Sequence, residues 1–345
     1  MVKRILAIIT VVAVVMGFSI SAYAKSGVIE LKFSSTVPPM VGLGKAQLAL
    51  LKKIEKETGG KVKIVPYWAN SLLKPREISR AVLSGVVDMA FWVVNVDLGM
   101  MKLNTVTGLP MMGFPSQKSL GDIHAKLLEK FPKMKAEFRG IIPYGIATFT
   151  PAQLNTVGKQ VLVPSDMKGM KIAPSNPDTA KLVLAGGGAP VNLVVTDWYT
   201  SAEKGVVNGF INVMGALIAF KVMDLMEYHT LLRPGGVSMT MSAILINPDV
   251  WNKFPPDVQK VFTDNERFYK DLLVKNTIAD TNRAIGYAKM KKHTVTVLTS
   301  KDKEWAEWQK AAKPIHEKWI AKHRSIGGKE VYEETLRLIK AYNGQ

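Results

Sequence analysis

Three strand-like segments open the chain's first α/β unit: Ile29-Glu-Leu-Lys-Phe33, Lys61-Val-Lys-Ile-Val-Pro-Tyr67 and Met89-Ala-Phe-Trp-Val-Val94. The first alternates apolar and polar residues as a half-buried strand does, and the last is a continuous apolar run typical of a buried strand. Between them, apolar residues recur at helical spacing over 44–58 and 78–82. This alternation of strand and helix predicts a parallel sheet with helices on its faces.

The ends of these predicted strands are candidate walls of a binding site. In parallel sheets ligands bind beyond the carboxyl ends of the strands, so the loops after Phe33, Tyr67 and Phe91 are expected to face a ligand. Aromatic residues recur at strand ends and helix starts along the chain, but core packing explains such residues equally well. These aromatic residues are Tyr67, Trp68, Trp92, Phe149, Trp198 and Tyr199.

A second α/β set begins near Gly145, which predicts two lobes. Ala243-Ile-Leu-Ile-Asn247 is a late strand expected to return to the first lobe, and the chain after Pro255 is mostly helical. We therefore expect an α/β, two-lobed periplasmic-binding-protein (venus-flytrap) fold with discontinuous lobes and long C-terminal helices. The predicted division is a first lobe of residues 25–150 plus 239–278 and a second lobe of 151–238 plus 279–345. The later expected helices are 116–139, bent near Pro132, then 178–185, 257–292, 301–323 and 329–342, and a short strand covers 295–298.

The N-terminus predicts export. Lys3 and Arg4 precede an uncharged run from Ile5 to Ile20, and Ser21-Ala-Tyr-Ala24 follows. This order of basic, apolar and small residues predicts a signal peptide over residues 1–24, cleaved after Ala24, and hence a periplasmic location. A membrane anchor retained in the mature protein is the alternative. Loss of Lys3 and Arg4 lowers the formal charge of +18, from 46 Lys+Arg and 28 Asp+Glu in 345 residues, to +16.

No residue pattern for catalysis, metal binding or cofactor binding is found. The chain has no cysteine, and its five histidines do not have the spacing of metal ligands. Neither a nucleophile elbow nor a phosphate-binding loop occurs, so Gly186-Gly-Gly188 is interpreted as a tight turn and Asp88 as a turn or capping residue. We expect a protein that is not an enzyme and takes no cofactor or metal; an exported enzyme on the same scaffold is the alternative.

Several blocks of sequence, weak alone, are specific in their order and spacing. Those of the first half are Glu57-Thr-Gly-Gly-Lys-Val-Lys-Ile64 and Glu77-Ile-Ser-Arg-Ala-Val-Leu-Ser-Gly-Val-Val-Asp-Met-Ala90. Those of the second half are Val163-Pro-Ser-Asp-Met-Lys-Gly-Met-Lys-Ile172, Gly188-Ala-Pro-Val191 and Trp198-Tyr-Thr-Ser-Ala-Glu-Lys-Gly-Val-Val-Asn-Gly-Phe-Ile-Asn212. Through nearly the whole mature chain the sequence resembles the extracytoplasmic solute-binding subunits of tripartite ATP-independent periplasmic (TRAP) transporters, of the dicarboxylate-binding type.

The resemblance implies a mechanism of closure rather than chemistry. Two lobes capture a small organic acid in the cleft between them and deliver it to membrane-embedded TRAP permease subunits driven by an ion gradient. Because the ligand contacts both lobes, it stabilises the closed form. A binding subunit of an ATP-driven importer, whose lobes are similar, is the alternative. Nucleic acid is not an expected partner, because export and dispersed cations argue against polyanion binding.

The residues at the family's ligand positions depart from its pattern. Where relatives carry an arginine after the Gly-x-Lys-Ile unit this chain has Ala173, and a second family arginine falls on Gln153. Asn212 is retained at the family's asparagine position. The matching first-lobe loops carry Thr36, Trp92 and Val93, and the second-lobe wall carries Val195 and Trp198. Without the two bidentate arginines, the site is expected to be unusually apolar and aromatic.

Two classes of ligand fit this pattern. Either a carboxylate is held by another cation, such as Arg233, Lys74 or Arg76, or the ligand is less acidic and more hydrophobic. We favour a hydrophobic or aromatic small molecule that can carry one carboxylate. Surface solvation is the alternative role for Arg233. The predicted ligand-binding residues are Thr36, Trp68, Trp92, Val93, Phe149, Gln153, Ala173, Val195, Trp198, Asn212 and Arg233.

Overall fold

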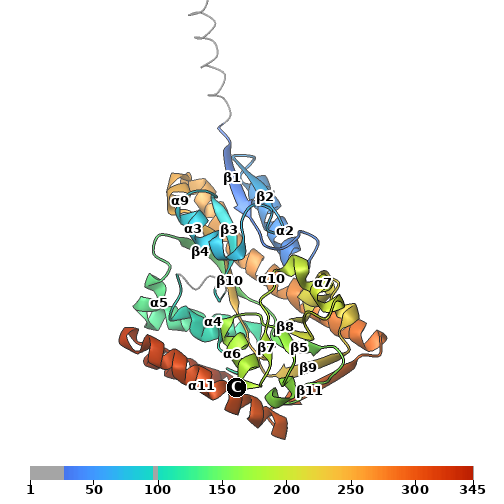
Figure 1. Cartoon of the computed structure of the whole chain (residues 1–345). Helices are drawn as coiled ribbons and strands as arrows, with labels where there is room; N and C mark the ends of the chain where they lie inside the picture. The colour runs from blue at the N-terminus through green and yellow to red at the C-terminus, as the bar shows by residue number, and fades with distance from the viewer. Residues whose placement is uncertain (1–26, 96–99, 345) are drawn as a thin grey trace, which may run out of the picture.

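A computed structural model describes residues 27–95 and 100–344 (Figure 1). The predicted signal peptide lies outside the described residues. Within the described part of the chain, no helix combines the length and the apolar character that crossing a bilayer requires.

The first sheet holds the three strands that the opening segment predicts. β1 pairs in parallel with both β2 and β3, so the carboxyl ends of all three meet at one edge. β10 then runs antiparallel between β3 and β4. In spatial order the strands are β2 (Val62–Tyr67), β1 (Ile29–Ser34), β3 (Met89–Val93), β10 (Met241–Ile246) and β4 (Ile142–Thr148).

The second sheet is also mixed. β5 runs antiparallel to β8 and β9, whereas β6 lies parallel to β7 and β8, and β11 parallel to β9. The strand order is β11 (Thr294–Thr299), β9 (Tyr228–Arg233), β5 (Ala152–Thr156), β8 (Gly209–Val213), β6 (Lys171–Ala173) and β7 (Ala189–Pro190). Two sheets joined by several crossings give the expected α/β architecture.

The parallel arrangement predicted from the first three strand segments is found for β1, β2 and β3, but the complete first sheet is mixed because β10 is antiparallel. β10 returns to the first sheet as expected, but it enters after β9 from the second sheet and pairs antiparallel with its neighbours. The strand Met241–Ile246, apolar except for Ser242, is buried on both faces and carries no signal for its direction. Its direction is set by where the chain crosses from one sheet to the other.

Short helices link the strands on the faces of the two sheets. In the first sheet these are α2 (Gly42–Glu57) and α3 (Ile78–Leu83), followed by α4 (Gln117–Lys130) and α5 (Pro132–Ala136), which are separated at the predicted Pro132 break. In the second sheet they are α6 (Pro177–Ala185), α7 (Trp198–Glu203) and α8 (Met214–Ala219), and α9 (Pro248–Lys253) follows β10. Single turns of 3₁₀ helix occur at Pro75–Glu77, Asn104–Gly108, Pro164–Met167, Val195–Asp197, Met223–Leu225 and Arg324–Ile326.

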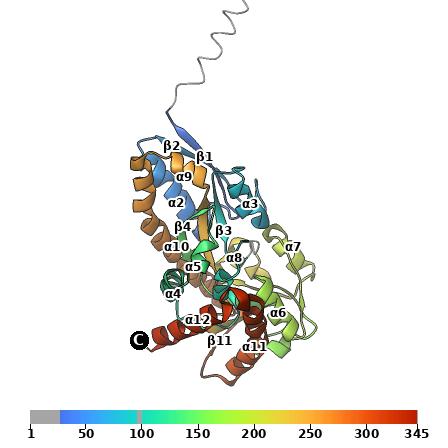
Figure 2. The same cartoon turned by 90° about the vertical axis from the view of Figure 1, so that its left-hand side faces the viewer.

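One long helix, α10 (Pro256–Met290), contacts elements of both sheets. It packs on α2 and β4 of the first and on α8 and β11 of the second (Figures 1 and 2). Its buried residues are three or four positions apart within two groups, which are separated by eleven positions, about three helical turns: Val258, Phe262, Asn265, Tyr269 and Leu273, then Ala284 and Ala288. Because these spacings keep the residues on one face of a helix, α10 presents the same face to both halves of the molecule.

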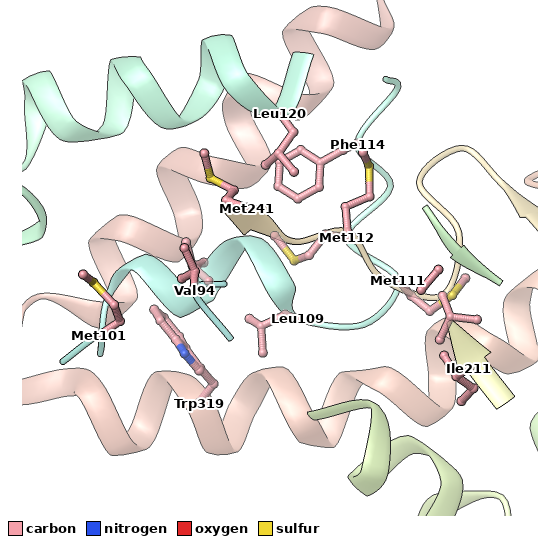
Figure 3. Close-up of a cluster of buried hydrophobic side chains, with 14 of the residues drawn as sticks. Val94, Met101, Leu109, Met111, Met112, Phe114, Leu120, Ile211, Met241 and Trp319 are labelled. Atoms are coloured by element: carbon pink, nitrogen blue, oxygen red, sulfur yellow. The ribbon is translucent and has the colours of Figure 1, made fainter. Parts of the chain in front are cut away.

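The C-terminal helices bridge the two halves. α11 (Lys303–His323) packs on α6, and α12 (Gly328–Asn343) packs on α4. A shared core beneath them takes residues from both sheets, and Trp319 of α11 points into a methionine-rich part of it (Figure 3). The strands divide between the sheets as the predicted lobes do, whereas α12 lies against a first-lobe helix. The exact lobe boundaries stay a prediction.

Candidate functional site

The predicted first-lobe residues lie where β1 and β2 end. Their loops are held together by main-chain hydrogen bonds, in which the Ser35 amide donates to the Tyr67 carbonyl and the Asn70 amide to the Ser35 carbonyl. Thr36 and Trp68 are both partly exposed beside these bonds. The Trp68 ring packs edge-on against Phe33, 6.0 Å between ring centroids. Thr36 and Trp68 therefore share one edge of the first sheet.

On β3, neighbouring predicted residues point to opposite faces. Successive side chains of a strand alternate, so Val93 lies on the side that carries Phe91, whose ring contacts Phe149 edge-on at 6.2 Å. Trp92 faces the other way, is 1% exposed and packs edge-on against Phe138 in the shared core. The structure brings Val93 and Phe149 together but not Trp92, whose role as a ligand contact stays a prediction.

In the second sheet, the three positions discussed for the family's ligand contacts lie on adjacent strands. Gln153 on β5 pairs in register with Asn212 on β8, and Ala173 on β6 pairs with Phe210 on β8. The Gln153 Oε1 accepts the Leu232 amide at 2.9 Å, and the Asn212 Oδ1 accepts the Val213 amide at 2.9 Å. Gln153 thus has a structural hydrogen bond of its own at the position of a family arginine.

Trp198 begins α7 and lies in an aromatic cluster. Its ring centroid is 5.3 Å from that of Phe210 and 5.6 Å from that of Phe220. Trp198 is buried, yet its indole Nε1 has no hydrogen-bond partner among the described residues. Val195, one turn earlier, is partly exposed and packs at the edge of the same cluster. A buried N–H donor without a partner is costly, and a polar group of a ligand would satisfy it.

The cations considered as replacements for the arginines all lie at the surface. Arg233 ends β9 just before Pro234, joined to it by a cis peptide bond, and its side chain is exposed. Lys74 and Arg76 are exposed around the 3₁₀ turn that precedes α3. None of the three lines the pocket described next.

A pocket of about 80 Å³ lies between the two halves, against α10. Nine of its twelve lining residues are apolar or glycine, and Phe149 is the only one among them that the sequence predicted. The first half contributes Val37, Val41, Leu43, Phe149 and Thr150; the second contributes Val213, Gly215, Ala216, Ala219 and Phe220; and α10 contributes Thr277 and Asp280. The sequence signal that could have indicated this pocket is a pair of small residues shortly after Asn212, Ala216 and Ala219, which lie one helical turn apart.

Asp280 connects α10 to the first turn of α2. Its Oδ2 accepts the Gly42 main-chain amide at 2.8 Å, and its Oδ1 accepts from the Arg283 guanidinium at 2.6 Å. Nearby on α10, the Asn276 side-chain Nδ2 donates to the Gly42 carbonyl at 3.0 Å. A Cβ on Gly42 would lie 2.4 Å from the Asp280 Oδ2, and one on Gly215 would lie 2.8 Å from the Asp280 Cβ. Asp280 therefore lies where both α2 and α8 pack closely against α10.

The described residues hold no cluster of histidines and carboxylates that could bind a metal ion. His124 bonds the Asn104 Oδ1 at 2.7 Å, and burial lowers its pKa to about 4. His229 lies between Asn155 and His293, and burial, reinforced by His293, lowers its pKa to about 4. The turn interpreted at Gly186-Gly-Gly188 is found between α6 and β7. Asp88 lies directly before β3 and accepts the Lys32 amide of β1, which is a contact between neighbouring strands rather than a helix cap.

Comparison with known proteins gives one family over most of the chain. The family described as bacterial extracellular solute-binding protein, family 7, matches residues 33–323. The C4-dicarboxylate-binding periplasmic protein DctP of Rhodobacter capsulatus is 24% identical over 351 aligned residues, which cover 98% of each chain.

Solved structures share the fold. A TRAP solute-binding protein from Rhodoferax ferrireducens, in complex with copurified benzoate, superposes with a TM-score of 0.82 at 20% identity and covers 92% of this chain and 99% of its own. Another, from Bordetella bronchiseptica with bound (R)- and (S)-mandelate, has a TM-score of 0.78 at 22% identity, covering 91% and 99%.

Proposed function

Because the chain belongs to the bacterial extracellular solute-binding proteins of family 7, we propose that it captures an aromatic or otherwise apolar monocarboxylate in the periplasm. The ligand would bind between the two sheets and be handed to membrane-embedded, ion-gradient-driven TRAP permease subunits. Family membership supports binding rather than enzymatic turnover. The N-terminal pattern of Lys3, Arg4 and an apolar run ending at Ala24 supports export by a cleaved signal peptide.

One observation carries the proposal on ligand class: the pocket between the sheets is lined mainly by apolar side chains, and none of the described residues that line it is a lysine or an arginine. A dicarboxylate held there would lose water from two charges without a fixed counter-charge, which is strongly unfavourable. Ala173 and Gln153 carry no positive charge that could balance the ligand, and the Gln153 Oε1 already accepts the Leu232 amide. Apolar walls favour a ligand with a ring or an alkyl group and a single acidic group.

Two of the similar structures support this ligand class. The Rhodoferax protein carries benzoate and the Bordetella protein carries mandelate, both aromatic monocarboxylates. The Rhodobacter relative is named for C4-dicarboxylates, so the family covers both chemistries. The mainly apolar pocket lining of this chain favours an aromatic monocarboxylate over a dicarboxylate.

Calorimetric titration of the mature protein, stripped of bound ligand by unfolding and refolding, tests the ligand class. We expect benzoate, 3-hydroxybenzoate and mandelate to bind at least tenfold more tightly than succinate or malate. Tight binding of succinate or malate, with no binding of the aromatic acids, would overturn the proposal. Uptake into vesicles that contain the cognate permease is expected to need an ion gradient and no ATP, whereas ATP-dependent uptake would favour the rival importer class.

A further inference from the structure

Two segments, residues 73–93 in the first sheet's half and 193–213 in the second's, are built in the same way. Each has a single turn of 3₁₀ helix, a six-residue α-helix (α3 or α7), a turn that contains Gly-Val-Val, and a strand (β3 or β8). Asp88 accepts the Lys32 amide at 2.7 Å, and Asn208 accepts the Lys171 amide at 2.8 Å, so each segment is tied to its neighbouring strand by the same contact. We call these segments the two repeat units.

The turn between helix and strand holds an exposed valine in both units. Gly85 and Gly205 have φ of +71° and +67°, a left-handed backbone that favours glycine. The second valine of each turn is buried. The first valines, Val86 and Val206, are 53% and 44% exposed. Backbone geometry accounts for the glycines and core packing for the buried valines, but neither accounts for the exposed ones.

The other exposed positions around these turns differ between the units. Arg80, Leu83 and Ser84 of the first correspond to Thr200, Glu203 and Lys204 of the second. One exposed valine needs no explanation, but the same valine at the same place in two units that otherwise differ at their surfaces points to a contact outside the chain. Among the described residues, five of the fourteen large apolar side chains that are exposed lie in the two units: Leu83, Val86, Val194, Tyr199 and Val206.

We infer that the two repeat units are docking points for the membrane-embedded permease, each through its exposed valine and the apolar residues near it. The inference rests on the proposed function, which requires this partner, and adds to it the surface that the partner contacts. In Figure 2, α3 and α7 lie on the right of the molecule and α2 and α10 on the left. One partner can therefore meet both units at once. Two linked contacts reinforce each other, so each can be small.

The charged residues of the two units differ in sign and give the docking a direction. The exposed charged residues of the first unit are Lys74, Arg76, Glu77 and Arg80, and those of the second are Asp197, Glu203 and Lys204. The first set has three cations and one acid, a formal charge of 3 − 1 = +2, and the second has one cation and two acids, 1 − 2 = −1. Because like charges that meet across an interface are unfavourable, these unlike rims prevent docking with the two units exchanged.

The first experiment places a charge at each docking point. In Val86→Glu and Val206→Glu an ionised carboxylate replaces an apolar contact and would have to lose water on docking. We expect gradient-driven benzoate uptake into vesicles that contain the cognate permease to fall at least threefold in each variant and at least tenfold in the double variant. Benzoate affinity by calorimetry is expected to stay within twofold of the wild type. Raising the concentration of the loaded protein should restore uptake, because docking rather than loading is weakened.

Val297→Glu is the matched control, because Val297 is 46% exposed on β11, outside both units, and its uptake is expected to equal that of the wild type. Melting curves show that each variant is folded, and Val86→Ser and Val206→Ser repeat the test without added charge. Wild-type uptake by the folded double variant would overturn the inference. So would a wild-type dimer in sedimentation that the double variant breaks, since a second copy would then occupy the units. A wild type that binds no benzoate, or gives no uptake, would overturn the proposed function and this inference with it.

The second experiment tests the direction of docking. Arg76→Glu reverses one charge of the first unit, and we expect it to slow uptake at least threefold while benzoate affinity stays unchanged. The control Arg267→Glu reverses an arginine of α10 whose side chain is 88% exposed, and its uptake is expected to equal that of the wild type. Equal uptake by the two variants would overturn the role assigned to the charged rims.

Discussion

A single carboxylate, that of Glu137, fixes the backbone where the chain leaves the first sheet. It accepts the main-chain amides of Lys102 at 3.1 Å, Leu103 at 2.7 Å and Asn104 at 3.2 Å, and the Asn104 side-chain amide at 2.8 Å. Asn104 in turn bonds His124. One side chain just after α5 therefore holds three successive residues of the segment that leads into the shared core.

Replacing Glu137 is expected to lower the stability of the protein. Glu137→Gln leaves one side-chain oxygen to accept from four N–H donors and places an NH₂ group where the other oxygen was. Hydrogen bonds are lost as a result, and each hydrogen bond to a charged group contributes about 1.5–3 kcal/mol. We expect the free energy of unfolding to fall by about 2–4 kcal/mol in urea denaturation. Glu129→Gln, which changes an exposed glutamate on α4, serves as control and should stay within about 0.5 kcal/mol. Equal effects of the two substitutions would contradict this account.

At the scale of elements, β4 and α10 approach each other closely at a glycine. The register of β4 against β10 shifts between Ser242 and Ile244, and Gly145 lies at this irregularity with φ of +61°. A Cβ on Gly145 would lie 2.5 Å from Cδ1 of Tyr269, a fully buried residue of α10. Both the left-handed backbone and the approach of the ring require glycine here.

The two requirements can be separated by a pair of substitutions. Gly59 has φ of +62°, and a Cβ added to it would meet no other atom within 4 Å, so Gly59→Ala tests the backbone alone. We expect Gly59→Ala to cost about 1–2 kcal/mol and Gly145→Ala to cost about 1–3 kcal/mol more, because overpacking of the core is added. Chemical denaturation of both variants gives the difference, and equal losses would show that the Tyr269 contact yields freely.

Which elements the sequence predicts follows from their local patterns. The strands and helices from Ile29 to Val93 have clear periodicity and glycine stops, and the helix expected over 257–292 is found at 256–290. β5, β9 and α8 were missed because each is short: Ala152–Thr156 is buried on both faces and so lacks alternation, and Met214–Ala219 is a single apolar run. Short buried runs look the same in helix and strand.

At the scale of the whole molecule, the candidate site could be predicted only in part. The strand pattern predicted that the loops after Phe33 and Tyr67, which carry Thr36 and Trp68, meet at one edge of the sheet. Ala173 and Asn212 were indicated only by the family resemblance, and their role in binding stays a prediction. The sequence did not predict the pocket, which needs the packing of three segments far apart in the chain, those around Val41, Ala216 and Asp280. No local pattern records that α10 brings these segments together.

The buried histidines make the stability of the whole molecule depend on pH. The pKa of His124 and that of His229 are each lowered to about 4 by burial, against an ordinary value of 6.5. Above pH 6.5 neither state binds the proton. As the pH falls below 6.5, each of these histidines binds a proton in the unfolded chain but not in the folded chain. The free energy of unfolding therefore decreases between pH 6.5 and about pH 4.

Each of these two histidines is expected to lower the free energy of unfolding by about 2 kcal/mol at pH 5 relative to pH 7, because one pKa unit corresponds to about 1.4 kcal/mol. Carboxylates with a lowered pKa lose their stabilising contribution only below about pH 4.5, outside this window. Glu334 is an example, because hydrogen bonds from Arg337 and Lys130 lower its pKa to about 2. In His124→Gln the amide can still donate to Asn104, but the titrating group is gone. Urea denaturation at pH 7 and pH 5 should therefore show a loss of stability that is smaller by about 2 kcal/mol in His124→Gln than in the wild type. An identical pH dependence of the two proteins would mean that the folded state admits the proton by opening locally around α4.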